Sequence, residues 1–145
     1  MPKIFHGTSK NCFIMKNIQY VGCDDAELDL FESQYALPDG MCYNSYVVLG
    51  EKQVAVMDGV DARCAHEWLD KVEEAMDGRT PDYLVCQHME PDHSGAMALF
   101  LEKYPYLDMV SIGPQMYGVH SPQERLSIPS TNRCYQWLCQ TLKSL

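Results

Sequence analysis

The sequence predicts an α/β fold in which helices cover a sheet. Two neighbouring segments, 42–49 and 53–57, are rich in β-forming residues, and an amphipathic helical pattern follows from 61 to 78. A short apolar segment at 83–87 then precedes a second helical pattern. Such alternation of strands and helices is typical of helices packed on a sheet.

The chain before residue 50 is predicted to be mostly extended. Apolar residues at 11–22 indicate one or two strands with an interruption at 16–17, and the acidic segment 23–31 is expected to be irregular. Pro38-Asp39-Gly40 predicts a turn, because proline fixes φ and glycine tolerates positive φ. The strands at 42–49 and 53–57 are joined by three residues, so we expect an antiparallel pair.

Two helices and a further strand complete the predicted α/β part. Asp61 is a candidate N-cap of the first helix and Gly78 a candidate stop, with one apolar stripe between them: Ala65, Trp68, Leu69, Val72 and Met76. A second helix opens near Ser94 and must end before Pro105. Residues 107–112 are predicted to form the next strand.

The corner between the strand at 83–87 and the second helix carries four metal-binding side chains. His88 and Glu90 are two residues apart, so on an extended backbone they point the same way and suit one cation. Pro91 makes a rigid turn, after which Asp92 and His93 suit a second cation nearby. We therefore expect a metal site on the loop between the two elements.

The mixture of imidazole and carboxylate ligands bears on the identity of the metal. It suits iron or manganese as well as zinc, and we favour iron. The alternative is that His88 and His93 are ordinary loop histidines, and that Glu90 and Asp92 cap the following helix. Capping accounts for one acid but not for four ligands in six residues.

Composition excludes several classes of protein. The 145 residues are 46% apolar, which is ordinary for a globular chain, and the net charge of −9 argues against a nucleic-acid surface. No apolar run approaches the roughly 20 residues of a membrane helix, and the N-terminus lacks the apolar core of a secretion signal. We expect a cytoplasmic protein whose seven cysteines are reduced. We expect none of them to be a ligand or a nucleophile, with Cys86 as the one candidate because it lies two residues before His88.

The composition changes near Gly113. Residues 1–112 carry 19 acidic and 8 basic side chains, whereas residues 113–145 carry 1 acidic and 3 basic ones. The later segment contains three prolines and one short candidate helix, Tyr135 to Leu142. We therefore expect two parts, an α/β part at 1–112 and an unassigned, irregular tail at 113–145 that is either disordered or frameshifted.

The order of motifs resembles the metallo-β-lactamase fold, an αββα sandwich. The residues that carry the resemblance are Met57-Asp58-Gly59 and the H-x-E-x-D-H motif at 88–93 followed by Ser-Gly. Glutamate at the second ligand position, with Tyr43-Asn44-Ser45-Tyr46 upstream, resembles the flavodiiron proteins, also called A-type flavoproteins or rubredoxin:oxygen oxidoreductases. The similarity spans roughly residues 12–112, which implies the first half of such a domain.

The resemblance implies a function and a set of cofactors. His88 and Glu90 correspond to ligands of one iron, and Asp92 and His93 to ligands of the other. Members of the family reduce dioxygen to water or nitric oxide to nitrous oxide at the diiron site. Their electrons come from a donor such as rubredoxin through FMN in a downstream domain, usually across a homodimer.

The resemblance also implies that the site is incomplete. The family uses a later histidine, a bridging aspartate and a final histidine, and none has a matched position here, since His120 stands in an unrelated context. The chain alone is therefore expected to be inactive. Two alternatives remain: a zinc hydrolase of the same fold using His88, Asp92 and His93, and a non-catalytic binding module.

Overall fold

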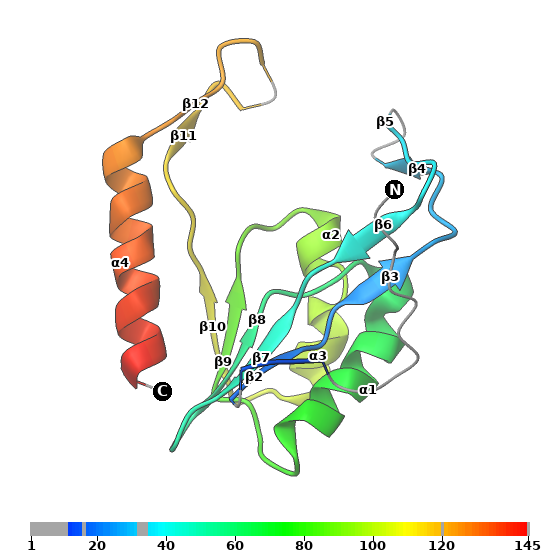
Figure 1. Cartoon of the computed structure of the whole chain (residues 1–145), viewed down its shortest axis with the longest axis vertical. Helices are drawn as coiled ribbons and strands as arrows, with labels where there is room; N and C mark the ends of the chain where they lie inside the picture. Colours follow the sequence, from blue (N-terminus) through cyan, green and yellow to red (C-terminus); the bar gives the residue numbers. More distant parts are fainter. Residues whose placement is uncertain (1–11, 16, 32–34, 120, 145) are drawn as a thin grey trace.

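The computed structural model describes residues 12–15, 17–31, 35–119 and 121–144. A six-stranded sheet with the order β1-β2-β7-β8-β9-β10 forms its centre (Figure 1). Neighbouring strands are antiparallel from β1 to β8 and parallel from β8 to β10. The bounds are β1 Cys12–Met15, β2 Ile18–Tyr20, β7 Tyr46–Leu49, β8 Val54–Met57, β9 Tyr83–Cys86 and β10 Asp108–Ser111.

Helices connect the parallel strands and cover one face of the sheet (Figure 1). Parallel neighbours need a crossover connection, and here a helical segment supplies each one. Between β8 and β9 lie the 3₁₀ helix η1 (Ala62–Cys64) and α1 (Ala65–Met76), and between β9 and β10 lie α2 (Pro91–Ser94) and α3 (Met97–Lys103). This arrangement confirms the predicted α/β class.

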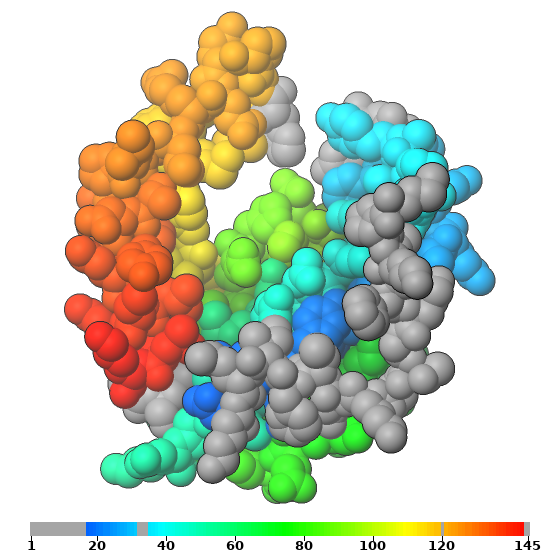
Figure 2. All heavy atoms as spheres, in the orientation of Figure 1, coloured from blue at the N-terminus to red at the C-terminus, as the bar shows by residue number. Residues whose placement is uncertain are grey.

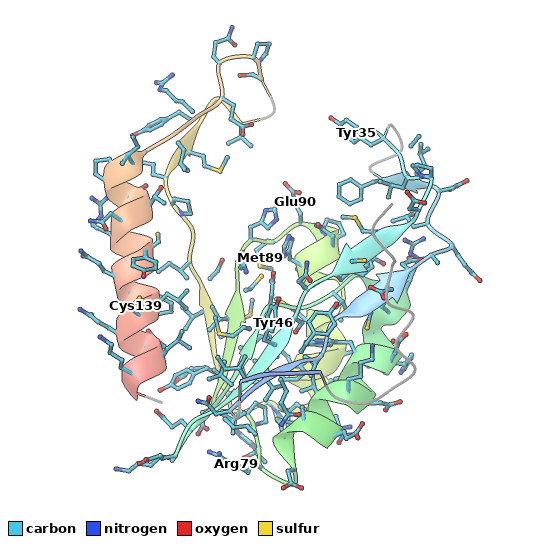
Figure 3. The ribbon with its side chains drawn as sticks, viewed as in Figure 1. Tyr35, Tyr46, Arg79, Met89, Glu90 and Cys139 are labelled. Carbon is cyan, nitrogen blue, oxygen red and sulfur yellow. The ribbon has the colours of Figure 1, made fainter. Side chains whose placement is uncertain are left out.

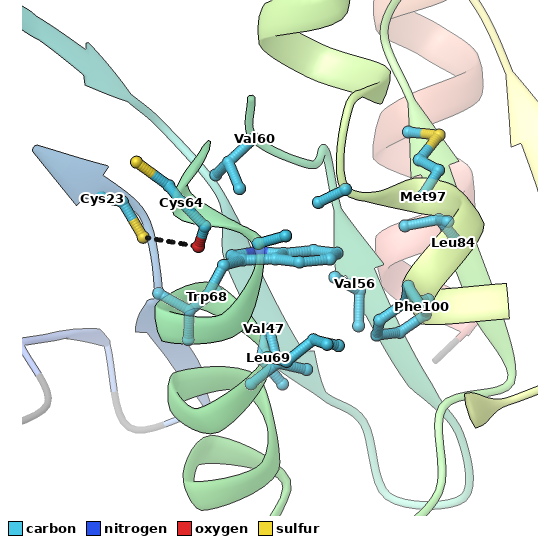
Figure 4. Packing of buried hydrophobic residues seen from close by; sticks show 14 of the residues in the cluster. Cys23, Val47, Val56, Val60, Cys64, Trp68, Leu69, Leu84, Met97 and Phe100 are labelled. Carbon is cyan, nitrogen blue, oxygen red and sulfur yellow. Dashed lines mark hydrogen bonds between the residues drawn. The ribbon is translucent and has the colours of Figure 1, made fainter. Parts of the chain in front are cut away.

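The main hydrophobic core lies between this sheet face and the helices, with Trp68 of α1 at its centre (Figure 4). Trp68 is fully buried, and its ring centroid lies 5.1 Å from that of Phe100 of α3. Its indole Nε1 donates a hydrogen bond to Ser45 Oγ over 2.9 Å, so the one polar atom of the ring is satisfied.

The acidic segment 23–31 is more regular than the sequence predicts. β3 (Cys23–Asp25) pairs with β6 (Met41–Tyr43), and β4 (Leu30–Phe31) pairs with β5 (Tyr35–Ala36). Cys23 is buried and Asp24 exposed, an alternation too short to be recognised among acidic neighbours. Long-range pairing with residues 41–43 therefore decides the structure of this segment.

The structure also differs from the predicted irregular tail. β11 (Met116–Tyr117) and β12 (Arg125–Leu126) form a hairpin, and α4 spans Ile128–Ser144, beyond both ends of the predicted short helix. The start of α4 was not predicted because Pro129 lies there, although proline is compatible with the first turn of a helix. Figure 2 shows the hairpin as a projection that stands apart from β4 and β5.

The second face of the sheet is thinly covered within the described residues. Among those residues its buried cluster contains only Val48 and Ala55, with partly buried neighbours. Of the α4 residues whose burial the structure describes, only Ser130 is buried. Ile128 and Tyr135 of α4 are 80% and 66% exposed. Apolar surface that the fold would normally bury therefore remains in contact with solvent.

We expect a marginally stable chain that aggregates on heating. Each apolar side chain left exposed forfeits roughly 1.5–3 kcal/mol, against a total stability of roughly 5–15 kcal/mol for an ordinary domain. Calorimetry and light scattering on the purified chain should show a broad, low-temperature transition accompanied by aggregation. A sharp, reversible, two-state melt of the monomer would contradict this expectation.

None of the described helices is both long and apolar enough to cross a membrane. The cysteines whose side chains the structure describes are all unpaired: Cys23, Cys42, Cys64, Cys86, Cys134 and Cys139.

Candidate metal centre

The candidate site lies at the carboxyl ends of the parallel strands β8 and β9. Asp58 directly follows β8, and residues 87–95 directly follow β9. Because the carboxyl ends of parallel strands meet at one edge of a sheet, polar side chains from separate loops converge there. Figure 3 shows Met89 and Glu90 on the loop at this edge, with Glu90 directed away from the sheet.

The structure brings the four predicted ligands together. In the described part of the chain, ligand atoms of His88, Asp92 and His93 all lie within 4.8 Å of one another. Glu90 Oε1 is 3.8 Å from His88 Nδ1, and Asp92 Oδ2 is 3.4 Å from His93 Nε2. Atoms that share one ion at bond lengths of about 2.0–2.2 Å lie at most about 4.4 Å apart. The separations of 3.8 and 3.4 Å within the two pairs fall inside this limit. His120, which was not predicted to be a ligand, lies outside the described residues.

Two details of the ligand segment differ from the sequence prediction. Asp92 and His93 lie in the one-turn helix α2 rather than on a loop, because Pro91 begins that helix. The His88 and His93 rings are 4.3 Å apart, so the two predicted ligand pairs adjoin one another. Glu90 occupies the N-cap position of α2, but its side chain makes no capping hydrogen bond. Capping therefore does not explain Glu90.

Asp92 Oδ1 is the atom of the cluster that most strongly indicates a bound cation. It is buried, and it has no hydrogen-bond partner within the described residues. A buried carboxylate oxygen without a partner is costly, and a cation would remove that cost. The donor set, two imidazoles and two carboxylates, fits iron, manganese or zinc.

Asp58 is a site residue that the sequence analysis missed. Its carboxylate is 3% exposed, its Oδ2 forms a short hydrogen bond with His93 Nδ1, and its Oδ1 accepts from the backbone N–H of Gln87. Because a carboxylate only accepts, His93 donates from Nδ1 and keeps the Nε2 lone pair for a metal. The sequence signal that could have identified Asp58 is its position directly after a strand. That strand neighbours the one that leads to the ligands.

The backbone around Asp58 is held by the core. Asp58 has φ of 68°, which is unusual for a residue other than glycine. Its carbonyl accepts a 2.8 Å hydrogen bond from Ser45 Oγ, and Ser45 in turn accepts from Trp68. The next residue, Gly59, contacts α2 so closely that an added Cβ would lie 2.5 Å from the His93 carbonyl oxygen. The core thus fixes His93 through Asp58 and Gly59.

The Cys86 side chain contacts the ligand segment and helps to fix its backbone. The thiol is fully buried, its Sγ donates to the His88 carbonyl over 2.8 Å, and it lies 3.7 Å from Met89 Sδ. Burial, with a smaller contribution from the charge of Asp58, raises the pKa of the Cys86 thiol to about 11. The thiol is therefore protonated at neutral pH and orients the loop.

We expect Cys86 to resist alkylation in the folded protein. Thiolates are the reactive form of cysteine, and Cys86 is both protonated and inaccessible. Iodoacetamide labelling at pH 7 followed by peptide mass spectrometry should leave Cys86 unmodified and label the exposed Cys42 faster. Equal rates for the two cysteines would contradict this assignment, and in denaturant both should react.

Comparison with known proteins identifies related chains, although no family model matches the sequence. An anaerobic nitric oxide reductase flavorubredoxin of Aliivibrio fischeri is 39% identical over 93 residues, covering 63% of this chain and 18% of the relative. A diflavin flavoprotein of Synechocystis is 33% identical over 124 residues, covering 83% of this chain and 22% of the relative. The chain thus spans about a fifth of the length of these relatives.

Solved structures agree with the sequence comparison. The flavodiiron protein of Giardia intestinalis superposes with a TM-score of 0.64 at 25% identity, over 75% of this chain and 25% of that one. Rubredoxin oxygen:oxidoreductase of Desulfovibrio gigas gives a TM-score of 0.59 at 31% identity, over 64% and 23% of the two chains. The described chain therefore carries part of the metallo-β-lactamase-like domain found in flavodiiron proteins.

Proposed function

We propose that this chain is the first, ligand-bearing part of an iron-dependent oxidoreductase domain. The observation that carries the proposal is the unpartnered, buried Asp92 Oδ1 inside the His88, Asp92 and His93 cluster. Glu90 lies beside His88 and would supply a ligand to a second ion. The names of the relatives, nitric oxide reductase flavorubredoxin and rubredoxin oxygen:oxidoreductase, support redox chemistry on small diatomic molecules.

The residues of this chain would hold and orient the metal. His93 would bind through Nε2, because Asp58 holds its Nδ1 proton, and Asp92 would bind through its buried carboxylate. Bound ferrous iron would supply the electrons for reduction of dioxygen to water or nitric oxide to nitrous oxide. Met89, which is 61% exposed on the same loop, offers an apolar wall that would limit the access of water.

The remainder of the catalytic assembly would come from outside the described residues. The proposal requires further ligands, FMN in a downstream domain, an electron donor such as rubredoxin, and assembly as a homodimer. With an incomplete ligand set, the chain alone should bind iron weakly and turn over neither gas, because metal affinity is coupled to a complete, folded site. The unpaired cysteines support a location in the reducing cytoplasm.

A zinc hydrolase is the second candidate, and one observation favours it. The three residues that the structure groups most tightly, His88, Asp92 and His93, would make a three-ligand site for one ion with an open fourth position. Such a site activates water for ester or thioester cleavage. In that case Glu90 would not be a ligand.

Metal content separates the two candidates. The chain is produced anaerobically with equal iron and zinc in the medium, and the bound metal is measured by mass spectrometry for the wild type and for Asp92→Asn. We expect sub-stoichiometric iron that is lost in the variant, with no hydrolysis of ester substrates. Stoichiometric zinc with ester or thioester cleavage would overturn the iron proposal, and equal metal content in the two proteins would overturn both.

A further inference from the structure

Helix α4 turns one of its faces towards the rest of the described chain. On that face, Ser130, Cys134 and Trp137 line a pocket together with residues of the segment 112–115. Ser130 Oγ also accepts a hydrogen bond of 2.7 Å from the backbone N–H of Gln115. Figure 1 shows α4 beside the β10 edge of the sheet, apart from α1 and α3. These two helices therefore do not cover the opposite face of α4.

The opposite face of α4 carries an apolar stripe. Ile128, Tyr135 and Leu142 are spaced by seven residues and are 80%, 66% and 38% exposed. Because a helix has about 3.6 residues per turn, this spacing brings all three to one face, with Asn132 and Cys139 between them. We call these five residues the α4 stripe. A helix that is apolar on opposite faces is typical of a buried position, yet the stripe is exposed.

The weak burial of α4 indicates that the helix lacks part of its packing. Isolated helices of fewer than about 12–15 residues are marginal in water, and most helical stability in proteins comes from packing of an apolar face. α4 spans Ile128–Ser144, and of its residues whose burial is described only Ser130 is buried. A partner that covers the α4 stripe would supply the missing packing.

The chemistry of the α4 stripe favours a neutral, apolar partner. None of its five side chains is charged, and the two cationic residues of α4, Arg133 and Lys143, lie outside it. A strongly acidic or basic partner would therefore gain no ion pair from the stripe. An anionic membrane surface is disfavoured as well, because α4 offers it only two cations and the whole chain carries a net charge of −9.

We propose that a second copy of α4 covers the stripe in an antiparallel homodimer. Tyr135 lies midway between Ile128 and Leu142, so two antiparallel copies place Tyr135 against its equivalent and each Ile128 against a Leu142. The stripe is thus self-complementary about a twofold axis. Antiparallel pairing also keeps the two Lys143 ammonium groups at opposite ends, whereas a parallel pair would bring them together.

This contact is separate from the homodimer proposed for the complete oxidoreductase. α4 follows the segment 12–112 that carries the resemblance to flavodiiron proteins, and none of its residues belongs to the metal cluster. The dimer would therefore form with or without bound metal.

Sedimentation velocity over a range of protein concentrations tests for the dimer. We expect a monomer–dimer equilibrium with a dissociation constant on the order of micromolar, because two short helices bury little surface. Tyr135→Glu should weaken dimerisation at least about tenfold, since it places two carboxylates against each other at the twofold axis. The matched control is Gln140→Glu, which adds the same charge on another exposed part of α4 and should change the constant less than about twofold.

Mixtures of oppositely charged variants test the orientation. Ile128→Glu and Leu142→Lys should each dimerise poorly alone, and their equimolar mixture should dimerise at least about tenfold more tightly than either one. Antiparallel copies place the new carboxylate opposite the new ammonium and leave the unchanged Leu142 opposite the unchanged Ile128. A mixture of Ile128→Glu and Ile128→Lys should not recover the dimer, since these positions face each other only in a parallel pair.

Four results would overturn the proposal. A monomer at all concentrations would show that the α4 stripe is not an interface between copies. Equal association of the wild type and Tyr135→Glu would place the contact elsewhere, such as on the thinly covered face of the sheet. Recovery only in the mixture of Ile128→Glu and Ile128→Lys would show a parallel pair. Co-sedimentation with anionic vesicles by a chain that stays monomeric in solution would identify a membrane as the occupant.

Discussion

Replacement of Trp68 with alanine is expected to unfold most of the protein at 25 °C. Loss of a fully buried tryptophan costs about 3–5 kcal/mol, because the transfer free energy of the ring is lost and a cavity is left behind. The substitution also removes the hydrogen bond from Nε1 to Ser45, whose hydroxyl holds the carbonyl of Asp58. Because the chain already exposes apolar surface, we expect this loss to exceed its whole free energy of unfolding.

Far-ultraviolet circular dichroism and urea titration measure this effect. Tyr106→Ala is the matched control, because it removes an aromatic ring that is 99% exposed and should change the free energy of unfolding by less than about 0.5 kcal/mol. A Trp68→Ala protein with wild-type helix content and urea midpoint would show that the core is not organised around this residue.

Asp58→Asn is expected to lower the metal affinity of the site about 10- to 100-fold with little change in fold. The amide is close in shape to the carboxylate and keeps an oxygen to accept from the Gln87 N–H. Its NH₂ group, however, would face His93 Nδ1 and favour the tautomer that carries the proton on Nε2. That tautomer places a proton on the nitrogen that should bind the ion.

Anaerobic calorimetric titration with Zn²⁺, and separately with Fe²⁺, measures this change. The control is Asp61→Asn, which removes the same charge from the N-cap of η1 on the loop that follows β8. Asp61→Asn should retain wild-type affinity, and both variants should keep the wild-type circular dichroism spectrum. An unchanged affinity in Asp58→Asn would show that His93 does not depend on Asp58 for its orientation.

Local sequence patterns correctly predicted the elements whose structure depends on residues close together in the sequence. The apolar stripe that ends at Met76 predicted α1, and the β-rich segments joined by three residues predicted the β7 and β8 pair. The ligand spacing at 88–93 predicted a cluster, and the structure brings His88, Asp92 and His93 together. In these cases residues close in the sequence decide the outcome.

Elements that depend on distant residues were predicted poorly. β3 exists because residues 41–43 pair with it, and Asp58 joins the site because β8 and β9 are parallel neighbours. Neither relation is visible within a short window of sequence. The extent of α4 was missed for another reason: its first turn is polar and contains Pro129, so it resembles a loop in the sequence.

The most direct test of the metal centre is an anaerobic titration of the ¹⁵N-labelled chain with Fe²⁺, because a paramagnetic ion broadens only the nuclear magnetic resonance signals near it. We expect the amide signals of residues 58–59, 87–90 and 92–95 to broaden first, whereas those of residues 106–108 remain sharp. Uniform broadening across the acidic surface, or none around His88, Asp92 and His93, would contradict a metal site at the end of β9.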